Sequence, residues 1–183
     1  MRVEWLLNRG GPHVAASRKG TIAGMAATPT IRPARLPDEV PAVRALFEEY
    51  AAGLGFSLCF QNFDAELAGL PGAYAPPAGR LLVADLDGEL AGCVALRPHT
   101  PGVCELKRLY VRPAFRGHGL GRRLLEALLA EAVAAGYREA VFDTLESMTE
   151  ALALYRAFAF EPTEAYGCHP VAGSLCFRKV LTA

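Results

Sequence analysis

The stretch from residue 108 to residue 132, RLYVRPAFRGHGLGRRLLEALLAEA, constrains the fold of this chain more than any other. It runs from apolar residues typical of a strand into a strongly amphipathic helix, and glycines at 117, 119 and 121 separate the two. Such a turn exposes unpaired N–H groups at the positive end of the helix dipole, where an anion such as phosphate binds well. The stretch therefore predicts a strand–turn–helix unit with an anion site at its turn.

The spacing of the glycines decides between the known phosphate-binding loops. The dinucleotide pattern G-x-G-x-x-G would need glycine where Arg122 stands, and the P-loop sequence Gly-Lys-Ser/Thr is absent. The pattern that remains is R-x-x-G-x-G, formed by Arg116, Gly119 and Gly121. A tight turn without a ligand is the alternative interpretation. Arg116, Arg122 and Arg123 surround the turn, where a helix favours acidic residues, and this density of positive charge favours a bound anion.

The remaining elements predict an α/β domain. Pro33 limits the strand near 30–35 to an edge of the sheet, and Asp38 is placed to cap the following helix. Asp87-Gly88 joins two apolar runs into a hairpin, and Ser147 with Glu150 forms a capping-box pattern. The expected order is a strand at 30–35, helices from about 38 to 52 and near 64–70, strands at 80–86, 89–98 and 103–111, a helix from 120 to 135, a strand at 139–145, a helix from about 148, and two closing strands. This order predicts a mixed central sheet with helices on both faces and a β-α-β unit at its centre.

Composition excludes several classes of protein. The 183 residues suit one domain, and 19 basic against 19 acidic residues provide no overall charge to attract nucleic acid or anionic lipid. The five cysteines lack a C-x-x-C pair, which indicates free thiols in a reducing compartment rather than disulfides or zinc. No apolar run approaches a membrane span. We therefore expect a cytoplasmic protein with no metal, nucleic-acid or membrane partner, in which 28–183 form the domain and 1–27 are a disordered leader or a mis-assigned start.

Beyond the turn itself, the chain resembles the GCN5-related N-acetyltransferase (GNAT) family. ELKRLYVRPAFRGHGLGRRLL is similar to the strand, turn and helix of that family, and DTLESMTEALALYRAFAFEP is similar to its next strand and helix. The resemblance covers about residues 28–182. Two positions depart from it: Ala159 stands where the family commonly has glycine, and Met148 where it often has an asparagine that reaches toward the cofactor.

The resemblance implies the GNAT fold, acetyl-coenzyme A as the cosubstrate and a set of cofactor-binding residues. The turn would take the pyrophosphate, and the backbone of Leu109 and Val111 would pair with the pantetheine arm where the strands at 103–111 and 139–145 splay apart. A β-bulge near Leu109 would free the necessary N–H groups. The expected cofactor-binding residues are Leu109, Tyr110, Val111, Arg116, Gly117, His118, Gly119, Leu120, Gly121 and Arg122.

Acetyl transfer to an amine needs a proton acceptor, an oxyanion donor and a proton for the departing thiolate. By resemblance Glu105 is the base, with a solvated charge paired to Lys107 as the alternative. Tyr155 is the acid, with a half-buried core aromatic as the alternative. A backbone N–H near Val111 would hold the oxyanion. Cys104 is not favoured as a nucleophile, because strand alternation points it away from Glu105.

The acceptor site is expected between the loop after the first helix and the loop between the last two strands. The candidate substrate-binding residues are Phe56, Phe60, Tyr166 and His169, together with Tyr50, Gln61 and Phe63, although these aromatics could equally pack the core. A primary amine of a small molecule or amino acid is the favoured acceptor, by direct transfer in a ternary complex. The alternatives are a non-catalytic acetyl-CoA sensor, a longer-chain acyltransferase, and an enzyme for a protein N-terminus or lysine. A homodimer is compatible with the family and is left open.

Overall fold

The structure is a computed structural model that describes residues 28–55, 58, 62–86, 88–166 and 173–182. The predicted leader, residues 1–27, lies outside these residues. The helices are α1 (Val40–Gly53), α2 (Phe63–Ala68), α3 (Leu120–Ala134) and α4 (Thr149–Ala157). The strands are β1 (Thr30–Pro33), β2 (Arg80–Leu86), β3 (Glu89–Thr100), β4 (Val103–Val111), β5 (Glu139–Leu145), β6 (Glu161–Thr163) and β7 (Ser174–Val180). Short 3-10 turns occupy Gly72–Tyr74 and Pro113–Phe115.

The seven strands form one sheet in the order β1-β2-β3-β4-β5-β7-β6. Among the described residues β4 and β5 are the parallel pair, and the other neighbours pair antiparallel. Strand β1, which contains Pro33, lies at the edge, as the missing proline donor requires. The predicted order of elements and the mixed sheet are therefore confirmed.

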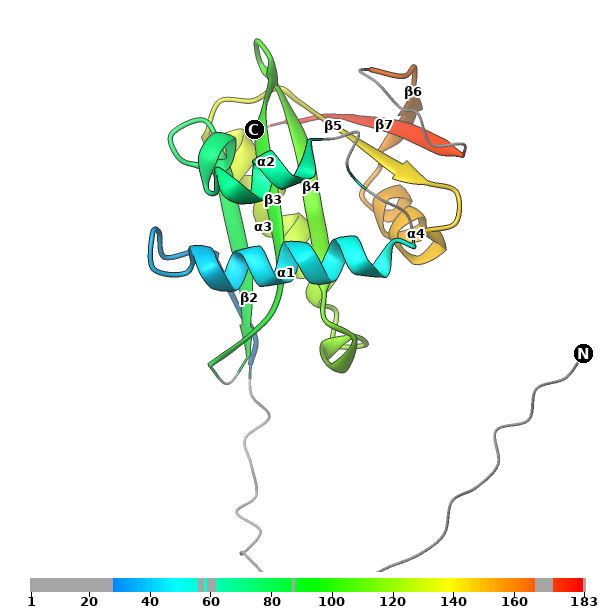
Figure 1. The fold of residues 1–183 in the computed structure, drawn as a ribbon. Helices are drawn as coiled ribbons and strands as arrows, with labels where there is room; N and C mark the ends of the chain where they lie inside the picture. The colour runs from blue at the N-terminus through cyan, green and yellow to red at the C-terminus, as the bar shows by residue number, and fades with distance from the viewer. Residues whose placement is uncertain (1–27, 56–57, 59–61, 87, 167–172, 183) are drawn as a thin grey trace, which may run out of the picture.

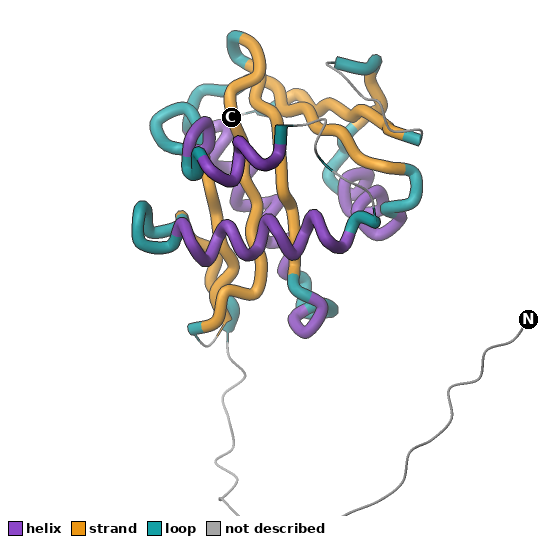
Figure 2. Tube along the Cα trace, in the orientation of Figure 1, coloured by secondary structure: helices purple, strands orange, loops and turns teal. Residues whose placement is uncertain are grey.

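Helices cover both faces of the sheet. Figure 1 shows α1 and α2 crossing in front of β2, β3 and β4, with α3 behind them, and Figure 2 shows the same layers by element type. The apolar stripe of α3, which includes Leu120, Leu124 and Leu128, is fully buried in one core. A second core on the opposite face contains Val43, Leu46 and Phe47 of α1. The helical periods in the sequence predicted both buried faces.

The parallel pair separates early along its length. Residues 103–105 of β4 pair with 139–141 of β5, and the described pairing ends at Glu105 and Val141. Beyond this point β4 continues to Val111 while β5 turns away toward β7 (Figure 1). The edge of β4 from Leu106 to Val111 therefore faces a gap instead of a strand, as the resemblance implied.

Both predicted helix caps are wrong. The N-cap of α1 is Glu39, not Asp38, and the Glu39 carboxylate binds Arg32 and Arg35 instead of capping the helix. Helix α4 begins after Met148, which has no side-chain cap bond, so Ser147 and Glu150 do not form a capping box. A cap depends on the backbone angles of one residue, and neighbouring ion pairs or turns can shift the helix start by a residue. None of the described helices is both long and apolar enough to cross a membrane.

Candidate active site

A groove with a volume of about 560 Å³ opens where β4 and β5 separate. The end of β4, the glycine turn and the start of α3 form one wall, and the region before and within α4 forms the other. The end of α1 closes one side. The lining residues are Tyr50, Gly53, Leu54, Leu109, Tyr110, Val111, Arg116, Gly117, Gly119, Leu120, Gly121, Ser147, Met148, Thr149, Glu150, Ala151 and Leu154.

The glycine turn has the backbone of an anion site. Gly117 and Gly119 adopt φ angles of 83° and 70°, which side chains rarely tolerate, and Gly119 is the N-cap of α3. The first intrahelical bond runs from Arg123 N to Gly119 O, so the N–H groups just before it are available to a ligand. The first turn of α3 contains no acidic residue. Arg116 donates from Nε to the carbonyl of Val111 at 3.1 Å, which holds this exposed side chain beside the turn.

The groove leads into a smaller inner cavity with a volume of about 40 Å³. The two share Tyr50, Leu109, Met148 and Ala151, so they are adjacent. Tyr155, Lys107, Arg108 and Asp143 are among the residues that line only the inner cavity. A space of this size holds about one or two water molecules. Together the groove and the inner cavity extend from the glycine turn to the side chain of Tyr155, and we call the pair the channel.

Tyr155 is both a core residue and a cavity residue. Its ring packs against Phe142, with centroids 3.8 Å apart, and the residue is only 8% exposed. Burial is the main cause that raises the pKa of Tyr155 above its ordinary value, so the phenol keeps its proton at physiological pH. The two interpretations of this tyrosine are therefore compatible: packing fixes the ring while the hydroxyl remains able to donate.

Glu105 is not a solvated charge, because it is only 6% exposed. Its Oε2 accepts from Arg97 at 2.7 Å, and its Oε1 lies 2.9 Å from Lys107 Nζ. Lys107 also donates to Asp143 Oδ1 at 2.6 Å. The result is a row of alternating charges, Arg97–Glu105–Lys107–Asp143, which crosses from β3 to β5 where the parallel pairing ends. We call it the charge row.

Asp143 and Arg108 belong to the inner cavity, and sequence reasoning missed both. The available signal was a charged residue within a strand: Asp143 interrupts the apolar residues of EAVFDTL, and Arg108 follows another charge, Lys107, in VCELKRLYV. Buried charges need partners, so each predicts an ion pair. Arg108 pairs with Glu66 of α2.

The candidate acceptor residues are only partly described. Phe56, Phe60, Gln61 and His169 lie outside the described residues and stay predictions. The ring of Tyr166 lies 5.0 Å from that of His99. Burial, and then the nearby carboxylates of Glu105 and Asp143, raise the pKa of Tyr166. Tyr166 therefore lies close to the charge row.

Two further acceptor candidates, Tyr50 and Phe63, lie near the inner cavity: Tyr50 lines it, and Phe63 contacts a residue that lines it. Tyr50 lines both the groove and the cavity. Phe63 is buried and faces the guanidinium of Arg108 at 4.9 Å. Both therefore contact residues of the site as well as packing the core.

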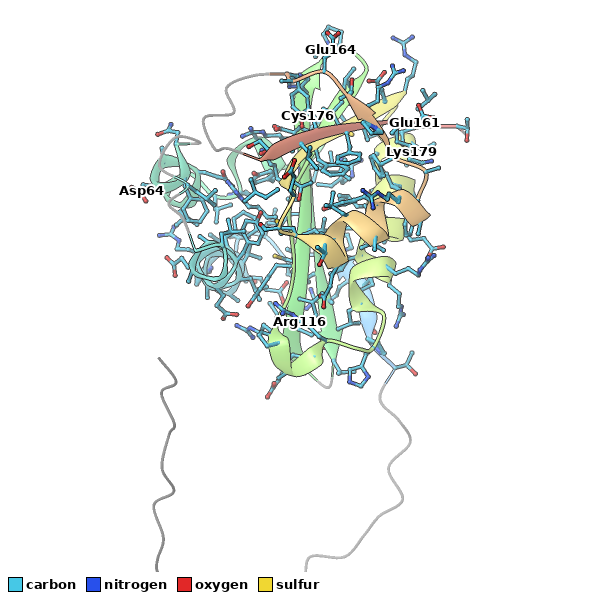
Figure 3. The ribbon with its side chains drawn as sticks, turned by 90° about the vertical axis from the view of Figure 1, so that its right-hand side faces the viewer. Asp64, Arg116, Glu161, Glu164, Cys176 and Lys179 are labelled. Atoms are coloured by element: carbon cyan, nitrogen blue, oxygen red, sulfur yellow. The ribbon has the colours of Figure 1, made fainter. Side chains whose placement is uncertain are left out.

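His118 and Arg122 differ from the other expected cofactor residues because neither lines the groove among the described residues. His118 is exposed in the turn, and the Arg122 guanidinium lies 5.0 Å over the Phe158 ring. Figure 3 shows Arg116 at the turn, at the far end of the molecule from Cys176 of β7. The other eight expected cofactor residues all line the groove.

Cys104 does not have the properties of a nucleophile. Cys104 is fully buried in the α3 core, and burial raises the pKa of its thiol to about 12, so it carries no thiolate at physiological pH. Within the described part of the chain, no group of three or more His, Cys, Asp or Glu side chains could hold a metal ion.

Comparison with known proteins matches the chain to one family and several relatives. Residues 40–160 match the Acetyltransferase (GNAT) family. An uncharacterised N-acetyltransferase of Schizosaccharomyces pombe is 40% identical over 81% of this chain and 93% of its own length. The aminoglycoside N(6′)-acetyltransferase type 1 of Stenotrophomonas maltophilia is 32% identical over 76% of this chain and 91% of its own. A GNAT family acetyltransferase from Elizabethkingia anophelis, solved with acetyl-CoA bound, has the same fold, with a TM-score of 0.60, 23% identity, and coverage of 84% and 98%.

Proposed function

The chain belongs to the GNAT family and is an acetyl-CoA-dependent N-acetyltransferase, and from this premise we propose that it acetylates a primary amine of a small molecule or amino acid by direct transfer in a ternary complex. The observation that carries the proposal is the pair of adjacent cavities that extends from the glycine turn to Tyr155. The aminoglycoside-acetylating relative supports a small-molecule amine as the acceptor.

The residues of the groove fit coenzyme A at its anionic end. Three glycines, the bare N–H groups of α3 and Arg116 offer hydrogen bonds and positive charge to a diphosphate. The edge of β4 at Leu109 and Val111 offers backbone groups to the pantetheine arm, as an added strand would require. Acetyl-CoA supplies the acetyl group as an activated thioester. His118 and Arg122 keep a proposed role as further donors to the phosphates.

The charge row supplies the proton acceptor. We assign this role to Glu105 together with Asp143, because Asp143 lines the inner cavity and Lys107 connects it to Glu105. Lys107 Nζ binds both carboxylates and fixes their positions, and in the proposed reaction they accept a proton from an acceptor ammonium directly or through water. Arg97 donates to Oε2 of Glu105 and so fixes the orientation of that carboxylate.

Tyr155, which also lines the inner cavity, supplies the proton donor. Its hydroxyl keeps its proton until a thiolate forms, because burial raises the pKa of the phenol. The Phe142 ring, tilted by 33° against the Tyr155 ring, holds the phenol in one orientation. The backbone N–H near Val111 is the proposed oxyanion donor. Each group therefore has one role: the carboxylates accept, the backbone stabilises, and the tyrosine donates.

The size of the inner cavity favours acetyl over longer acyl groups. A volume of about 40 Å³ leaves room for only the end of a short acyl group, so a longer chain would have to displace Tyr155 or Leu109. Tyr155 belongs to the packed α3 core, so its displacement would cost core contacts. We propose that the protein discriminates against longer thioesters at this point.

A thiol-release assay with acetyl-CoA tests the proposal. The acceptor panel contains simple amines, polyamines, amino acids and aminoglycosides. We expect at least one acceptor, and a fall in turnover of roughly 100-fold for Tyr155→Phe and for Asp143→Asn. Tyr137→Phe is the matched control, because the Tyr137 hydroxyl binds the Ala78 carbonyl on the surface, and its rate should stay unchanged.

Two results would count against the proposal. Acetyl-CoA binding without thiol release for any amine would favour a sensor. Unaltered turnover in Tyr155→Phe would remove the tyrosine from the acid role.

A further inference from the structure

We propose that Arg108 and Glu66 form a positioning pair that holds the bulge of β4 in the shape needed by the pantetheine–thioester end of the cofactor, separately from the seat of the diphosphate. This inference rests on the proposed function and adds two residues to it. Neither residue touches the glycine turn: Arg108 lines the inner cavity, and Glu66 lies on α2.

The bulge is visible in the register between β3 and β4. Cys93 pairs with Tyr110 and Ala95 pairs with Lys107, so two residues of β4, 108 and 109, oppose Val94 alone. Leu106 and Leu109 both pack in the α3 core, whereas Lys107 and Arg108 between them both bind partners on the opposite face. Two consecutive side chains on one face are the signature of a β-bulge.

The bulge holds Arg108 in an unfavourable backbone conformation. Its φ is 59°, in the left-handed region, which costs a residue with a side chain more than glycine. Such a conformation persists only where surrounding contacts fix it. The sequence places an arginine here, and we assign the restraint to the contacts of its side chain.

The Arg108 guanidinium contacts a carboxylate and two aromatic rings. Nε and Nη2 donate to the two oxygens of Glu66 at 2.9 and 2.6 Å, and the two side chains are 2% and 10% exposed. Tyr74 donates to the same Glu66 at 2.8 Å. The guanidinium lies 4.9 Å from the Phe63 ring and 5.7 Å from the Tyr50 ring. The planar guanidinium is held by two hydrogen bonds to one carboxylate and by two aromatic rings, which restricts it to one orientation.

This anchor lies directly beside the reacting end of the channel. Arg108, Leu109 and Tyr155 all line the inner cavity. If the anchor is loosened, the bulge can relax toward a regular strand, which would reverse the faces of neighbouring residues. The N–H groups near Leu109 would then move, while the glycine turn, eight or more residues later, would keep its own hydrogen bonds.

A second arginine–glutamate pair on the same strand end provides a control. Arg112 binds Glu49 of α1 through Nε and Nη2, at 2.9 and 2.7 Å. This pair is also bidentate, but its side chains are 31% and 38% exposed, and Arg112 has an ordinary φ of −55°. Neither residue lines the groove or the inner cavity among the described residues. Glu49 also accepts from the Tyr110 hydroxyl at 3.5 Å, and a glutamine oxygen can accept the same bond, so Glu49→Gln weakens a helix–strand contact and leaves the contacts of the bulge in place.

The test compares two probes by calorimetry: acetyl-CoA, and adenosine 3′-phosphate 5′-diphosphate, which carries the nucleotide and both phosphates of the diphosphate but no pantetheine. In Glu66→Gln the Kd for acetyl-CoA should rise about ten-fold, which equals about 1.4 kcal/mol. The Kd for the nucleotide should change by less than about two-fold. In Glu49→Gln neither Kd should change.

Loss of a buried charge partner can also unfold a protein, so a milder variant accompanies the first. Tyr74→Phe removes one hydrogen bond to Glu66 and leaves the ion pair in place. Its Kd for acetyl-CoA should rise by about three-fold with nucleotide binding unchanged, and this result decides the question if Glu66→Gln does not fold.

Three outcomes would overturn the inference. Equal losses for both probes would indicate a general structural role, and no loss for either probe would indicate no role in binding. If the unaltered protein bound neither probe, the proposed function itself would fail, and the inference with it.

Discussion

The substitution Gly121→Ala should raise stability and lower cofactor affinity, and this opposition isolates the binding role of the glycine. Gly121 has no positive φ, and a Cβ built there would lie 3.7 Å from Leu154 Cδ2, an ordinary contact. The folded chain alone therefore gives no reason for glycine at this position. The position lines the groove beside the bare N–H groups of α3, so a ligand that approaches the backbone does give a reason.

The two effects can be estimated separately. Alanine in place of glycine in a helix gains up to about 1 kcal/mol, and we expect about half of this in the first turn, or roughly 1–2 °C in Tm. A methyl group that blocks one hydrogen bond to a charged phosphate costs about 1.5–3 kcal/mol. That loss corresponds to a Kd for coenzyme A that is roughly ten- to a hundred-fold higher.

Calorimetry with coenzyme A and thermal unfolding measure the two quantities on the same samples. Gly136→Ala is the matched control, because Gly136 ends α3 with a φ of 87° and lies outside the groove. It should lose about 1 kcal/mol of stability through strain and keep its affinity. The reasoning is refuted if Gly121→Ala binds coenzyme A as tightly as the unaltered protein.

Three further predictions follow from the described contacts. Arg116→Ala should weaken coenzyme A binding and flatten its dependence on salt concentration, measured by calorimetry at several ionic strengths; an unchanged salt dependence would separate Arg116 from the phosphates. Ala159→Gly should raise the free energy of unfolding by about 1 kcal/mol, because Ala159 holds a φ of 56°; lower stability in a denaturant titration would contradict this. Hydrogen bonds from Arg32, and then from Arg35, lower the pKa of Glu39 well below its ordinary value. The Glu39 carboxylate therefore contributes its full stability above about pH 4.5, and this contribution is lost as the pH falls toward the lowered pKa. Glu39→Gln should therefore be less stable near neutral pH and should lose less stability on acidification, and parallel pH–stability curves for the two proteins would disprove the assignment.

The regular elements were predictable because each depends on a local pattern. The bounds predicted for β4 and β5 agree with the structure, since their apolar residues end at turn signals on both sides. The apolar stripe of α3 and the stop near Gly136 came from the helical period. The splay of β4 and β5 and the bulge near Leu109 came from the resemblance to a family, which no periodicity would have supplied.

The polar contacts of the site were not predictable from local patterns. Glu66 and Arg108 are 42 residues apart in the chain, and Lys107 and Asp143 are 36 apart, so their pairing depends on how the sheet and α2 assemble. Sequence reasoning recognised Glu105 and Lys107 as a pair on one strand, but it missed that Arg97 and Asp143 extend the pair into a row. The partners of a buried charge are set by tertiary packing rather than by spacing.

The most direct test of the account is a crystal structure of the protein soaked with coenzyme A. The account predicts the diphosphate at the N–H groups between Arg116 and Gly121, and the sulfur in the inner cavity within hydrogen-bonding distance of the Tyr155 hydroxyl. A diphosphate bound elsewhere, or a sulfur directed away from that hydroxyl, would contradict it.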